Sequence, residues 1–163
     1  MYRMFKIQIK KINYKGQLFL IFIILFLFQN ISIALEEKKF LSLKKDKVFV
    51  RQGHSFEYPV KYIYKKKYLP LLVLDSWNNF RKIKDFENNE GWIHISQLSK
   101  KKTAINIKDN SLLFKNSTIY SEPLAKISKG KILIIKKCKK VWCKVGVDEY
   151  VGWVKKKALW GRI

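Results

Sequence analysis

The two cysteines are the residues with the most definite chemistry. Cys138 and Cys143 are the only cysteines in the chain and are separated by residues 139–142. A turn at these four residues would place the two side chains opposite each other, at the Cβ spacing that a disulfide requires. We predict a structural disulfide, with free buried thiols or a metal site as the alternatives. Zinc would need four ligands, and the other soft donors are the distant His54 and His94.

His54 and His94 are also the only imidazoles, which limits acid–base chemistry. Neither stands in a recognisable relation to a serine or cysteine nucleophile, and no paired-carboxylate motif accompanies them. A Cys–His hydrolase would need a free thiol and an imidazole from far upstream. We therefore predict that the protein is not an enzyme and uses no cofactor or metal. For His94, beside Trp92, we expect a hydrogen-bonding role on a barrel surface or between domains.

Residues 1–34 have the three parts of a secretory signal peptide. A basic, acid-free segment precedes the unbroken apolar run Leu18–Phe28, and the small residues Ser32 and Ala34 follow. We predict cleavage after Ala34 and a periplasmic or secreted protein, where oxidising conditions favour a disulfide. A membrane-spanning helix needs about 20 apolar residues; an uncleaved inner-membrane anchor is the alternative.

The charge is strongly basic, with 35 Lys+Arg against 12 Asp+Glu and a formal net charge of +23. Almost all of these bases are lysine, whereas proteins that read phosphates and bases favour the planar fork of arginine. Together with export, this makes nucleic-acid binding only a minor alternative. The lysine runs 65–67, 100–102 and 155–157 indicate either solvated loops in a lysine-rich composition or contacts with an anionic partner.

The chain after the signal is typical of an all-β protein. Short runs rich in Val, Ile, Leu and Tyr alternate with Gly, Pro, Asn and Asp, without a long amphipathic helical stripe. Gly91-Trp92-Ile93 recurs as Gly152-Trp153-Val154. The glycines permit a bulge or a close backbone approach, and the tryptophans pack across a barrel, with stacking on a ligand as the alternative. We predict an N-terminal signal helix followed by two small barrels, 40–101 and 102–163.

The first repeat resembles the bacterial SH3-like (Src homology 3) domain. The pattern Val48-x-Val50-Arg51-x-Gly53, followed by Gly91-Trp92-Ile93 and Leu98, carries the resemblance, which extends over both repeats. It is closest to a small tandem family of exported proteins in Gram-negative bacteria. The resemblance implies tandem SH3-like barrels that act as targeting or ligand modules, which are often appended to cell-wall hydrolases.

Three positions of the first repeat and one segment of the second depart from the family pattern. His54 stands where the family has proline, Phe80 where it has tryptophan, and Tyr68 where a loop glycine is expected. The second repeat has Phe114-Lys115-Asn116 in place of the Arg-x-Gly signature. We therefore expect that the two barrels do not serve the same ligand equally.

Trp77 is the leading candidate for ligand contact, because it stands on a turn that borders the ligand groove in SH3-like barrels. The candidate groove residues are Trp77, Tyr58, Tyr62, Phe86 and Arg51. For Arg51, a cation beside the groove and a strand-end ion pair are both open. We predict recognition of cell-wall peptide or glycan, or of another envelope protein. Electrostatic association with an anionic membrane or lipopolysaccharide is the alternative, and the oligomeric state is left open.

Overall fold

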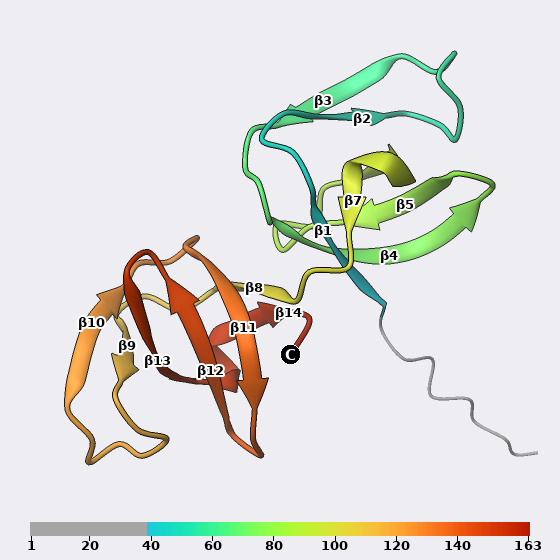
Figure 1. Ribbon diagram of the computed structural model, residues 1–163. Helices are drawn as coiled ribbons and strands as arrows, with labels where there is room; N and C mark the ends of the chain where they lie inside the picture. The colour runs from blue at the N-terminus through green and yellow to red at the C-terminus, as the bar shows by residue number, and fades with distance from the viewer. Residues whose placement is uncertain (1–38) are drawn as a thin grey trace, which may run out of the picture. The chain divides into compact units, whose positions relative to one another are not determined.

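Short β-branched and aromatic runs form fourteen strands in the computed structural model, which describes residues 39–163 (Figure 1). The strands make two seven-stranded antiparallel sheets. The prediction of an all-β protein with two tandem barrels is therefore confirmed. The predicted signal helix, its cleavage site and the anchor alternative lie outside the described residues. Among residues 39–163, no helix is long and apolar enough to cross a membrane.

The first sheet occupies residues 40–99 and has one 3₁₀ turn, η1 (Ile95–Gln97), before its last strand. Its strands are β1 (Phe40–Leu43), β2 (Val48–Arg51), β3 (Val60–Tyr64), β4 (Pro70–Trp77), β5 (Phe80–Lys84), β6 (Glu90–His94) and β7 (Leu98–Ser99).

The second sheet occupies residues 103–161 and likewise has a 3₁₀ turn, η2 (Lys156–Ala158), before its last strand. Its strands are β8 (Thr103–Asn106), β9 (Ser111–Phe114), β10 (Pro123–Ile127), β11 (Ile132–Cys138), β12 (Trp142–Val147), β13 (Tyr150–Lys155) and β14 (Leu159–Gly161).

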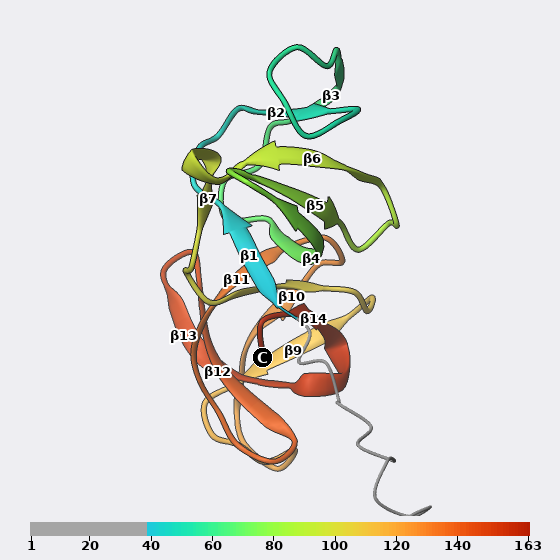
Figure 2. The ribbon, with the colours of Figure 1, turned by 90° about the vertical axis from the view of Figure 1, so that its right-hand side faces the viewer.

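The two sheets have the same topology. The strand order is β3-β2-β6-β5-β4-β1-β7 in the first and β10-β9-β13-β12-β11-β8-β14 in the second. Each position in the first order is therefore occupied in the second by the strand that lies seven later in the chain. The chain crosses from one group of strands to the other between β7 and β8, which are labelled in Figure 1; Figure 2 shows the two groups from the side. The repeat seen in the sequence is thus a repeat of the whole barrel.

The repeated glycine fits a close approach between two strands. A Cβ built on Gly152 would lie 2.7 Å from the carbonyl oxygen of Phe114, which belongs to the neighbouring strand β9. At Gly91 the equivalent Cβ would overlap the side chain of Val50. Only glycine allows β13 and β6 to pass so close to these neighbours.

The two barrels share apolar packing through β8. Successive residues of this strand face opposite sides: Ala104 belongs to the core of the second barrel, whereas Ile105 belongs to the core of the first. Trp160 on β14 also packs against the first core, with its ring centroid 5.0 Å from that of Phe40. The second barrel therefore contributes side chains to the first core.

Candidate ligand-binding surface

Arg51 braces the loop between β2 and β3. Its guanidinium Nη1 donates hydrogen bonds to the carbonyl oxygens of Phe56 at 3.0 Å and Tyr58 at 2.7 Å. The guanidinium carbon also lies 5.4 Å from the centroid of the Phe56 ring. Arg51 is thus the loop's internal support rather than a partner in a strand-end ion pair, one of the two roles that the sequence left open.

Gly53 makes room for an aromatic ring in the same loop. A Cβ at this position would lie 2.5 Å from Cγ of Tyr58, far inside van der Waals contact. The Arg-x-Gly signature has a local explanation: the arginine holds two loop carbonyls, and the glycine lets the Tyr58 ring lie against the backbone.

The loop brings exposed rings together with the β4–β5 turn. The His54 ring centroid lies 5.0 Å from that of Trp77 and 5.6 Å from those of Tyr58 and Trp92. Trp77 is the last residue of β4 and is 56% exposed, and Tyr58 is 43% exposed. Trp77 and Tyr58, both predicted groove residues, therefore both contact the His54 ring.

A second group of rings comes from the same loop and from strands β5 and β6. Phe56 is 61% exposed, and its ring centroid lies 5.1 Å from that of Phe80 and 5.0 Å from that of His94. Phe80 and His94 are cross-strand partners on β5 and β6. As expected for a surface hydrogen-bonder, Nδ1 of His94 lies 2.8 Å from the Ser96 hydroxyl. We call the seven rings together the aromatic surface: His54, Phe56, Tyr58, Trp77, Phe80, Trp92 and His94. Phe80 is itself buried, at 6% exposed, and contacts the exposed ring of Phe56.

Two predicted groove residues have other surroundings. Tyr62 and Phe86 pack against the core of the first barrel and make no ring contact with the aromatic surface. The Tyr62 hydroxyl lies 3.4 Å from that of Tyr64, which donates a 2.9 Å hydrogen bond to Oδ2 of the buried Asp85. Burial, with the hydrogen bonds to Tyr62 and Asp85, raises the pKa of Tyr64 above its usual value.

Sequence reasoning did not assign His54, Phe56, Phe80 or His94 to the ligand surface, and it gave Trp92 mainly a core role. The sequence does hold one clue to this surface. Trp92 and His94 are two residues apart on β6, so the period of two in a strand places them on the same face. The rest depends on which strand lies beside which, and that is a property of the folded barrel.

The equivalent strand positions of the second barrel carry different residues. In the first barrel Arg51 pairs with Trp92, and at the equivalent place in the second barrel Phe114 pairs with Trp153. An aromatic ring therefore stands where the first barrel has the guanidinium that braces the loop. No arginine therefore holds the β9–β10 loop from this position. Tyr120 in that loop is 92% exposed.

Lysines lie over the buried tryptophans of the second barrel. The ammonium groups of Lys139 and Lys137 lie 5.0 Å and 5.9 Å from the ring centroid of Trp153, and that of Lys155 lies 5.7 Å from Trp142. Trp142 and Trp153 are each only 7% exposed. The aromatic surface of the first barrel thus has a cationic counterpart in the second.

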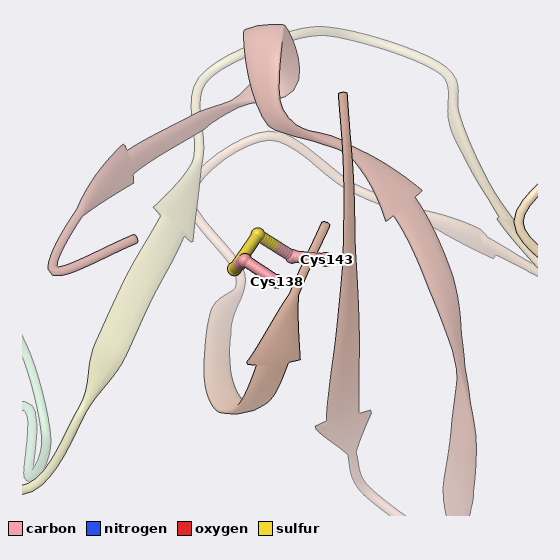
Figure 3. The surroundings of a disulfide bond; sticks show 2 residues. All are labelled: Cys138 and Cys143. Atoms are coloured by element: carbon pink, nitrogen blue, oxygen red, sulfur yellow. A yellow bond between two sulfur atoms is a disulfide. The ribbon is translucent and has the colours of Figure 1, made fainter. Parts of the chain in front are cut away.

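A disulfide joins Cys138 and Cys143, which confirms the prediction (Figure 3). The two residues are cross-strand partners at the end of the β11–β12 hairpin. In the first barrel, the pair at the end of the corresponding hairpin is Trp77 and Phe80. One hairpin end is therefore covalently closed, whereas the other presents an exposed indole. Among residues 39–163, no three His, Cys, Asp or Glu side chains are grouped to hold a metal ion.

The sequence matches the family model of the bacterial SH3 domain over residues 44–100 and 113–161, one segment in each sheet. The chain belongs to the bacterial SH3 domain family. No curated protein matches it. Two similar solved structures are NlpC2 and NlpC1 from Trichomonas vaginalis, with TM-scores of 0.36 and 0.34 and sequence identities of 10% and 12%. The comparison covers 78% of this SH3-domain chain and only 49% and 47% of those proteins, about half their length.

Proposed function

We propose that this SH3-domain protein is an exported, non-catalytic binding protein that recognises cell-wall peptide or glycan, or another envelope protein, through the aromatic surface of its first barrel. The signal peptide 1–34, cleaved after Ala34, and domains spanning 40–101 and 102–163 are parts of the same proposal. The disulfide supports export, because such bonds persist in oxidising compartments.

The observation that carries the proposal is the exposure of three large rings, each of which contacts another ring of the aromatic surface. Phe56, Trp77 and Tyr58 are 61%, 56% and 43% exposed, although a soluble barrel gains by burying such side chains. Exposed aromatic clusters mark binding surfaces, because each ring offers a large apolar contact at a small entropic cost. Sugar faces and extended peptides can both lie against such rings.

The loop that presents the rings is held in place before any ligand binds. Arg51 fixes the carbonyls of Phe56 and Tyr58, and the backbone N–H of Gln52 donates to the carbonyl of Pro59 at 3.1 Å. Preorganisation reduces the ordering cost of binding. The first barrel therefore carries the proposed recognition, since the second lacks the bracing arginine.

The test is a pull-down of the full-length protein on purified sacculi at low and high salt. We expect wild-type binding to persist in high salt and Trp77→Ala to lose it, because stacking does not depend on screened charge. Tyr120→Ala is the matched control, as it removes a still more exposed ring outside the aromatic surface.

Sacculi stripped of their stem peptides separate the two wall ligands. Retained binding identifies the glycan, and lost binding identifies the peptide. If the protein binds no sacculus preparation, co-purification from the envelope tests for a protein partner, with Trp77→Ala again expected to abolish capture. Equal salt-resistant binding by wild type and Trp77→Ala would refute the proposed surface.

A further inference from the structure

We propose a second site, a phosphate-binding crevice between the two barrels. It has a volume of about 480 Å³ and lies between the loop before β4 and the turn before β11. Four lysines line it, two from each barrel: Lys66, Lys67, Lys129 and Lys131. The site is independent of the aromatic surface and goes beyond the binding proposed above.

The lysines converge because the two loops meet. Nζ of Lys66 donates to the carbonyl oxygen of Gly130 across the barrel boundary at 3.4 Å. The one carboxylate in the lining, Asp148, is engaged by Lys131 at 2.8 Å. The other three lysines have no carboxylate partner in the lining and can therefore bind an anion. Lysine is an established phosphate ligand, acting as a point charge.

A buried asparagine holds the second loop in place. Asn106 is fully buried and donates from Nδ2 to the carbonyl oxygens of Ile127 and Ser128 at 3.0 Å and 3.1 Å. Its own backbone carbonyl accepts from the N–H of Gly130 at 2.8 Å. The turn that carries Lys129 and Lys131 is thus positioned without any ligand, which lowers the cost of binding one.

Tyr68 lines the crevice in a strained backbone conformation. It has a φ of 65°, a left-handed conformation that is strained in a residue other than glycine. Its side chain also lines the crevice, and the ammonium groups of Lys101 and Lys67 lie 4.0 Å and 5.4 Å from its ring centroid. Glycine would relieve the strain but remove the ring that these lysines contact.

The expected occupant carries several phosphate groups on a carbon skeleton. Lysine ammoniums supply the charge, and Ile132, Ile134 and Val147 supply an apolar part of the lining. Such phosphates occur on anionic lipid headgroups and on free phosphorylated compounds, and the experiment separates these two sources.

The direct test titrates the full-length protein with tripolyphosphate by calorimetry. We expect saturable binding that Lys66→Gln/Lys129→Gln weakens by about tenfold or more, since two charge-assisted contacts are lost. Lys139→Gln/Lys140→Gln is the control: it removes the same charge from exposed positions in the β11–β12 turn, at the opposite end of that hairpin from the crevice. It should change affinity less than about twofold, as distant exposed charges are screened.

Three further experiments test whether the site is independent of the aromatic surface, whether it prefers phosphate, and which source of phosphate it binds. Trp77→Ala should bind tripolyphosphate normally, so failure of the aromatic surface would not affect this site. Citrate at matched charge should compete poorly. Cosedimentation with phosphatidylglycerol vesicles, displaced by tripolyphosphate, would assign the site to headgroups, whereas calorimetric binding without cosedimentation would assign it to free phosphates. Absence of saturable binding, equal loss in both lysine variants, or equal competition by citrate would overturn the proposal.

Discussion

Ile105→Ala tests whether the two barrels share a core. Ile105 belongs to β8 of the second sheet, yet its side chain is fully buried in the core of the first barrel. Truncating it should therefore destabilise the first barrel from a position outside that barrel's own sheet.

The expected cost follows from the complete burial of the side chain. Ile→Ala in a core costs about 2–5 kcal/mol, through lost transfer energy and the cavity left behind. A loss of about 3 kcal/mol would accelerate amide exchange by global unfolding roughly a hundredfold. It would also remove a large share of the 5–15 kcal/mol that is typical of small proteins.

Hydrogen exchange followed by mass spectrometry measures this by segment. We expect Ile105→Ala to accelerate exchange in β5 and β6 of the first barrel. Leu133→Ala is the control, since Leu133 is equally buried but belongs to the second core; it should affect the second barrel more than the first. If Ile105→Ala accelerated exchange only within 103–161, the shared core would be refuted.

Three further predictions concern single features of the barrels. Replacing Cys138 and Cys143 together by serine should lower the free energy of unfolding by about 2 kcal/mol through lost loop closure, measured by denaturant titration; an unchanged midpoint would contradict this. Gly53→Ala should displace the Tyr58 ring and weaken sacculus binding several-fold, because the new Cβ has no room; unchanged binding would remove the proposed role of the signature glycine. The raised pKa of Tyr64 means that the folded state favours the neutral phenol, so its stabilising contribution is complete below the unfolded pKa of about 10 and is lost as pH rises beyond it. The stability difference between wild type and Tyr64→Phe should therefore shrink above about pH 10 in thermal melts; a difference that stays constant would show that the phenol does not titrate as argued.

Local patterns explain why the fold and the disulfide could be predicted from the sequence. A cysteine pair with four residues between its members can close a hairpin wherever that hairpin lies, so the Cys138–Cys143 bond needed no knowledge of the rest of the chain. The repeated Gly-Trp motif likewise marks one strand in each barrel, because the requirement for glycine arises from a neighbour that recurs in both copies.

The ligand surface was only partly predictable, because it depends on strand neighbours. Trp77 and Tyr58 were identified from a turn and a loop, whereas His54 joins them only when β2, β4 and β6 are assembled. Tyr62 was included because it is aromatic, but period-two alternation and packing direct it to the core. Residue type alone does not reveal which side of a barrel a ring will face.

The sequence by itself determined the strand-rich fold, its duplication, the family and the disulfide, because each rests on residues close together in the chain or on a motif that repeats. Only the tertiary structure decided that Ile105 completes the first core and that lysines from two distant loops converge on one crevice. The physical reason is that such contacts depend on how one barrel packs against the other, and packing between surfaces distant in sequence leaves no periodic pattern in either.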